Sequence, residues 1–93
     1  MVVTLNVNKR RDEFLRKIYF HLGGDTTVWE MDVHAIGREW GYSDDEIDSF
    51  LEYWEKNQCI EVTRTFGAET VAVRLTSDGF KCVRDVLFCR FMK

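Results

Sequence analysis

The sequence predicts an α+β fold, in which helices pack against a small antiparallel sheet. Before Cys59 the apolar residues mostly repeat at helical spacing, whereas after it they alternate with polar residues, as in a strand with one buried face. The chain has 93 residues, of which 45% are hydrophobic and 31% are charged, a composition typical of a globular protein. This length suffices for one modest core, so we expect a single domain over residues 1–93.

The first third of the chain predicts a short strand followed by a long helix. Residues 2–7 alternate apolar and polar side chains, which favours a strand. Asn8 is a suitable N-cap for a helix over 9–22, and Gly23 is placed to end that helix. The β-branched and aromatic residues at 27–31 predict a second brief strand.

Two closely spaced helices follow and predict a helix-turn-helix over 32–58. Asp32 can cap the first of them, and Gly41 lies where it would end. Ser43 and Glu46 have the spacing of a capping box, in which each side chain accepts a hydrogen bond from the backbone N–H of the other residue. The apolar stripe of the second helix comprises Ile47, Phe50, Leu51 and Trp54.

The remainder predicts a β-hairpin over 60–75 and a last helix over 78–92. Apolar residues alternate with polar ones on both sides of a turn at 67–69. Thr76 or Ser77 can cap the last helix.

Helix, short strand, two closely spaced helices and a hairpin, in that order, resemble the winged helix-turn-helix family over almost the whole chain. The resemblance is carried by residues 32–60 (DVHAIGREWGYSDDEIDSFLEYWEKNQCI) and 74–79 (RLTSDG). It implies a homodimeric transcription regulator that binds double-stranded DNA, with the helix at 43–57 in the major groove and the hairpin at 60–75 as a wing. In size, lack of proline and presence of cysteines the chain is also similar to small dimeric winged-helix proteins of crenarchaeal viruses, which implies the cytoplasm of a host cell.

Charge is distributed unevenly along the chain, whose net charge is −3. Residues 25–58 carry ten acidic and two basic groups, so the face of the 43–57 helix opposite its apolar stripe is acidic. Carboxylates repel phosphates, and phosphate attraction must therefore come from outside this helix. On that exposed face of the helix, the predicted DNA contacts are Ser49, Tyr53 and Lys56. The basic groups predicted to meet phosphate are Arg64 and Arg74 on the hairpin and Arg10 and Arg11 on the first helix.

Each of these residues also has an ordinary interpretation as a surface group, and the acids at 44–46 complement the N-terminal dipole of their helix. The alternative function is a winged-helix module that binds protein instead of DNA and uses its acidic helix as the contact surface. Binding to duplex DNA that weakens steeply with salt would distinguish the two.

The last helix predicts a dimer interface, because it carries two separate apolar stripes. One can dock the helix on its own domain and comprises Phe80, Val83, Leu87 and Phe91. The other lies about 140° away and comprises Cys82, Val86 and Cys89. A small domain cannot cover both stripes, so we expect a homodimer. Two-fold symmetry could join Cys82 or Cys89 to a cysteine of the other chain, while reduced thiols in a dry interface are the alternative.

The sequence disfavours several other classes of protein. No apolar run reaches the roughly 18 residues of a membrane span, and the first residues lack a secretory signal, so we expect a cytoplasmic protein with no membrane partner. His21 and His34 have no neighbouring nucleophile, and the acids at 44, 45 and 48 point around a helix. We therefore predict no enzyme activity, no catalytic residue, no metal site and no cofactor.

Overall fold

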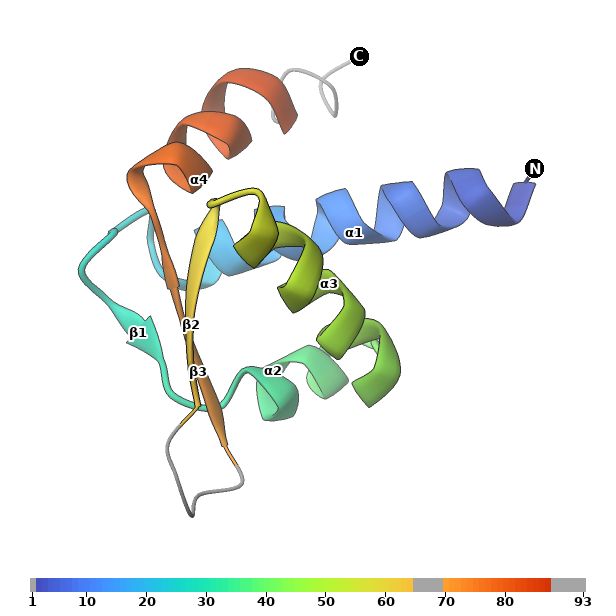
Figure 1. The fold of residues 1–93 in the computed structure, drawn as a ribbon, viewed down its shortest axis with the longest axis horizontal. Helices are drawn as coiled ribbons and strands as arrows, with labels where there is room; N and C mark the ends of the chain where they lie inside the picture. Colours follow the sequence, from blue (N-terminus) through green and yellow to red (C-terminus); the bar gives the residue numbers. More distant parts are fainter. Residues whose placement is uncertain (1, 65–69, 88–93) are drawn as a thin grey trace.

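The computed structural model describes residues 2–64 and 70–87, with side chains described over 9–64 and 70–84 (Figure 1). The elements are α1 (Val2–His21), β1 (Trp29–Glu30), α2 (Val33–Glu39), α3 (Asp44–Lys56), β2 (Ile60–Arg64), β3 (Val71–Leu75), α4 (Ser77–Lys81) and a π-helix over Cys82–Leu87. The strands form one antiparallel sheet in the order β1-β3-β2. The α+β class is confirmed, and the arrangement is compatible with a winged helix.

The strand predicted at the N-terminus is wrong, because these residues form the first turns of α1. Val3 and Val7 alternate with polar residues but also stand four apart, which suits a helix equally well. A run of six residues is too short to distinguish the period of a strand from that of a helix. A helix also satisfies its backbone hydrogen bonds without a partner strand. Asn8 consequently lies inside α1 and does not cap it. Figure 1 shows the N-terminal turns of α1 extending past the other elements.

The two predicted helices at 32–58 are confirmed together with their caps. The Asp32 carboxylate accepts a hydrogen bond from the backbone N–H of Ala35 at 3.2 Å, which starts α2. The capping box at α3 is complete, since the N–H of Glu46 donates to Ser43 Oγ at 3.2 Å and the N–H of Ser43 donates to Glu46 Oε1 at 3.1 Å. Gly41 adopts a φ of +95° between the helices, a conformation that other residues rarely adopt.

The hairpin is also confirmed, with β2 paired to β3 so that Ile60 lies opposite Leu75 and Arg64 opposite Val71. The predicted turn at 67–69 lies outside the described residues. The brief strand predicted at 27–31 shortens to β1, which pairs with the other side of β3. One face of the sheet packs against the helices, and its residues Ile60, Val73 and Leu75 are buried.

The core lies between the sheet and the three longer helices. Phe14 of α1 is at its centre and is fully buried. Its ring centroid lies 5.4 Å from that of Phe50, 5.5 Å from that of Tyr42 and 6.1 Å from that of Trp40. These tilted and edge-to-face contacts hold α1 against α3 and against the segment that joins α2 to α3.

The last helix begins as predicted and then changes type. The Thr76 hydroxyl accepts a hydrogen bond from the N–H of Gly79 at 3.0 Å and donates to the carbonyl of Gln58 at 2.6 Å. From Cys82 the chain forms a π-helix that packs against α1, with Val83 fully buried. Residues 88–92 of the predicted helix lie outside the described part of the chain.

Gly79 of α4 lies against the backbone of Cys59, in the segment between α3 and β2. A Cβ at this position would lie 1.9 Å from the carbonyl oxygen of Cys59, so a backbone segment would have to move. We expect Gly79→Ala to lower the free energy of unfolding by about 3 kcal/mol or more, although alanine favours a helix. Gly23→Ala is the control, because a Cβ there meets open space and only the positive φ opposes it, at a cost of about 1 kcal/mol. If urea denaturation shows that Gly79→Ala and Gly23→Ala lower the free energy of unfolding equally, the proposed clash is contradicted.

Candidate functional site

The site predicted from the sequence centres on the exposed face of α3. Ser49, Tyr53 and Lys56 are all exposed there. The Tyr53 ring also contacts α1, because the guanidinium carbon of Arg11 lies 3.6 Å from the ring centroid. The structure therefore brings Arg11 and Tyr53 together as one cation–π pair on α1 and α3.

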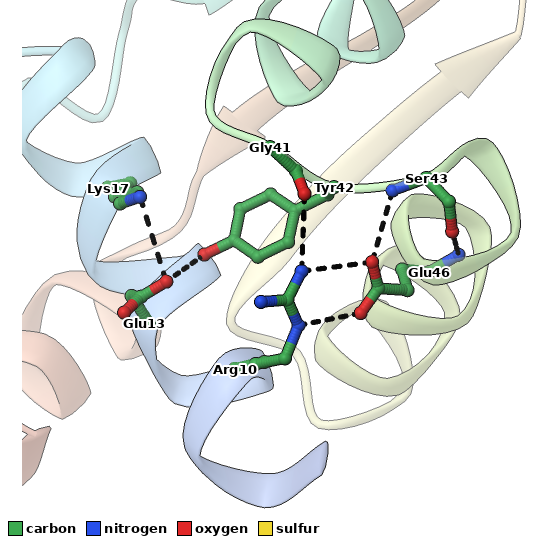
Figure 2. A network of polar contacts seen from close by, with 7 residues as sticks. All are labelled: Arg10, Glu13, Lys17, Gly41, Tyr42, Ser43 and Glu46. Atoms are coloured by element: carbon green, nitrogen blue, oxygen red, sulfur yellow. Dashed lines mark hydrogen bonds and ion pairs between the residues drawn. The ribbon is translucent and has the colours of Figure 1, made fainter. Parts of the chain in front are cut away.

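Arg10, by contrast, is engaged inside the domain at the start of α3 (Figure 2). Its Nε and Nη2 donate to the two carboxylate oxygens of Glu46 at 2.7 and 3.0 Å, and its Nη2 reaches the carbonyl of Gly41 at 3.3 Å. This bidentate pair neutralises the charge that was predicted to meet phosphate. It also holds the pKa of Glu46 below its usual value, with the hydrogen bond from Arg10 as the largest cause.

Tyr42 makes a second contact between α1 and the turn before α3, as Figure 2 also shows. Its side chain is buried, and its hydroxyl donates to Glu13 Oε1 at 2.5 Å, while Lys17 Nζ lies 3.6 Å from the same oxygen. The hydrogen bond from Tyr42 lowers the pKa of Glu13. Burial, followed by this same hydrogen bond to the Glu13 carboxylate, raises the pKa of Tyr42.

The carboxylates of α3 divide into paired and unpaired groups. Asp44 accepts from Arg38 Nε at 2.8 Å, which lowers the pKa of Asp44, and Asp48 lies 2.7 Å from His34 Nε2. The remaining exposed carboxylates make no ion pair with the described residues; they are Asp45, Glu52 and Glu55. The outer face of α3 thus presents three carboxylates that form no ion pair with a described side chain.

On the hairpin, Arg74 is also engaged within the domain. It lies opposite Glu61 in the β2–β3 register, and its Nη2 donates to both oxygens of that carboxylate. Its guanidinium carbon also lies 5.1 Å from the centroid of the Trp29 ring. Arg64 is exposed and forms no ion pair with the described side chains, so it remains the hairpin's available cation.

The pairing of Arg74 with Glu61 was missed at the sequence level. A turn at 67–69 would place Glu61 opposite Leu75, whereas the observed register places it opposite Arg74, where the opposite charges attract. The pair of Arg10 and Glu46 had no local signal, since these residues are 36 apart in the sequence.

Of the two cysteines predicted to face a dimer partner, Cys82 is partly buried against the core of its own chain. Cys82 packs against the buried core and interacts with Cys59, whose thiol is buried. Burial raises the pKa of Cys59 to about 12, so its reactive thiolate form is suppressed. The side chains of Val86 and Cys89 lie outside the described residues, and the dimer interface with its disulfide stays a prediction.

Comparisons with protein-family models, curated proteins and solved structures found no match to this chain. Within residues 2–64 and 70–87, every helix is too short or too polar to span a bilayer. In the same stretches, no three His, Cys, Asp or Glu side chains come close enough to share a metal ion. The site must therefore be interpreted from its own geometry and charge.

The contacts of Glu46 predict a specific pH dependence of stability. Because its pKa is lower in the folded chain than the usual 4.5, Glu46 stabilises the fold above that pH, and this contribution is lost as the pH falls through the folded-state value. Glu46→Gln should therefore be less stable than wild type at pH 7 but lose less stability between pH 5 and 3. Urea denaturation across this range measures both effects.

Glu52→Gln is the matched control, because it removes an exposed carboxylate of the same helix outside these contacts. It should follow the wild-type curve. If Glu46→Gln loses as much stability on acidification as the wild type does, the pair with Arg10 does not stabilise the fold.

Proposed function

We propose that this chain is a winged-helix interaction module that binds a basic protein surface through the exposed face of α3. The observation that carries the proposal is the charge of this helix, which has six carboxylates and a single basic residue, Lys56. Duplex DNA carries one negative charge per roughly 1.7 Å of its axis. Inserting α3 into a DNA groove would therefore bring its unpaired carboxylates close to two rows of phosphates.

The arginines that could offset this repulsion support the same proposal. Arg10 binds the Glu46 carboxylate through two nitrogens, and Arg74 binds both oxygens of Glu61 through Nη2, so attraction to phosphate would require breaking those contacts. Arginines held in this way do not release counterions from DNA as free ones do.

The exposed face of α3 has the features of a protein interface on a small scale. Tyr53 is 37% exposed and is held in place by the Arg11 guanidinium, and such aromatic and arginine side chains are frequent anchors of interfaces. Carboxylates around the anchor would speed the approach of a basic partner.

The second candidate is the homodimeric DNA-binding regulator implied by the family resemblance. It is favoured by the order of α2, α3 and hairpin, and by Arg64, which is exposed at the end of β2 and unpaired among the described side chains. In that case the hairpin would supply the phosphate attraction and α3 would contribute Ser49, Tyr53 and Lys56. The homodimer through Cys82, Val86 and Cys89 belongs to this candidate.

A zero-length carbodiimide crosslinker tests the first candidate, because it joins carboxylates directly to lysine amines. In cells that produce the chain, we expect partner peptides joined to Asp45, Glu52 or Glu55. The double variant Asp45→Asn with Glu52→Gln should lower the affinity of the purified partner about threefold to tenfold, while the control Glu39→Gln, on α2, leaves it unchanged.

Fluorescence anisotropy with a labelled duplex of random sequence, at low and at physiological salt, tests the alternative. We expect no binding by the wild type under either condition. Binding that weakens steeply with salt and is reduced by Arg64→Ala, together with an absence of crosslinks on α3, would overturn the first candidate in favour of the second.

A further inference from the structure

A hollow of about 440 Å³ lies between the second half of α1 and the end of α2. Its volume falls within the range of small-molecule sites. Five of the lining residues project from α1 and one follows α2; they are Glu13, Arg16, Lys17, Phe20, His21 and Trp40. No predicted DNA contact and no part of α3 lines it.

The lining of this hollow carries two cations, Arg16 and Lys17, and one carboxylate, that of Glu13. His21 also lines it, and its Nε2 lies 2.5 Å from Glu30 Oε1. Lys17 Nζ lies 3.6 Å from Glu13, a longer separation than in a close ion pair. The lining therefore favours a negatively charged ligand.

Two aromatic rings complete the lining. Phe20 is 54% exposed, and the Arg16 guanidinium lies 5.7 Å from its ring centroid. Trp40 is half-buried, and its ring is held edge-to-face by His21 at 5.7 Å and by Phe14 at 6.1 Å. A rigid ring beside an exposed ring offers apolar surface on which a planar group can lie.

We propose that this hollow binds a small aromatic anion, with its ring against Phe20 and Trp40 and its carboxylate or phosphate held by Arg16 and Lys17. The planar guanidinium suits either anionic group, while the ammonium adds a point charge. This site goes beyond the proposed function and does not depend on it, because it requires no macromolecular partner.

The hollow is connected to the start of α3 through Glu13. That carboxylate contacts Lys17 in the hollow and accepts the hydrogen bond of Tyr42 in the turn before α3 (Figure 2). An anion that draws Lys17 away from Glu13 changes the charge facing Tyr42. Ligand binding should therefore alter the environment of the turn at 41–43 as well as that of the hollow.

Titration with 2-naphthoate, followed by calorimetry and by amide chemical shifts, tests the site. 2-Naphthamide is the neutral control of the same shape, and we expect the naphthoate to bind at least about tenfold more tightly. The largest shift changes should fall on residues 13–21 and on the Trp40 indole, with smaller ones at 41–43. 2-Naphthyl phosphate distinguishes the two anionic groups: tighter binding than that of the naphthoate indicates a phosphorylated ligand, and equal or weaker binding indicates a carboxylate.

The variants test the role of each side chain. Lys17→Gln should weaken binding of the naphthoate roughly tenfold. Phe20→Ala should weaken it as well, and because Phe20 is exposed this variant should still fold. Lys81→Gln is the control, since it removes an exposed ammonium that does not line the hollow. The proposal is overturned if the naphthoate fails to bind at millimolar concentration, binds no better than the amide, or binds equally to all of these variants.

Discussion

The position of α3 depends on Tyr42, the buried residue in the turn that precedes it. Gly41 takes the positive φ that turns the chain inward, and the Tyr42 ring then packs edge-to-face against Phe14 and Phe50. A buried phenol needs a hydrogen-bond acceptor, which Glu13 of α1 provides. This one side chain thus joins α1 to α3, and its backbone N–H donates to the carbonyl of Gly37 in α2 at 3.1 Å.

Glu46 acts on the same junction from the outside. Its carboxylate closes the capping box of α3 and also accepts hydrogen bonds from Nε and Nη2 of Arg10, so the cap and the attachment to α1 share the oxygen Oε1. The pair is half exposed, so its net stabilisation is modest, but its two parallel hydrogen bonds fix geometry as well as charge. The consequence for function is that a basic residue close to α3 in space contributes little positive field at its surface.

Local signals in the sequence predicted most of the fold and little of the candidate site. Asp32, the Ser43 and Glu46 box and Thr76 each define a helix start through contacts within three residues, and these predictions are confirmed. The N-terminal strand failed because its short alternating pattern fits a helix as well. The partner of Arg10 could not be predicted, since it depends on how α1 crosses α3, which only the packed core determines.

The remaining surface carries charge in two separate places of opposite sign. Carboxylates dominate α3, whereas cations and aromatic rings line the hollow on α1. The net charge of the whole chain, −3, does not reveal either feature. Glu13 and Lys17 of the hollow reach the junction, and the Glu13 carboxylate accepts the hydrogen bond of the Tyr42 hydroxyl. Because the buried Tyr42 ring packs against Phe14 of α1 and Phe50 of α3, we expect a change at Glu13 to alter the contact that joins these two helices.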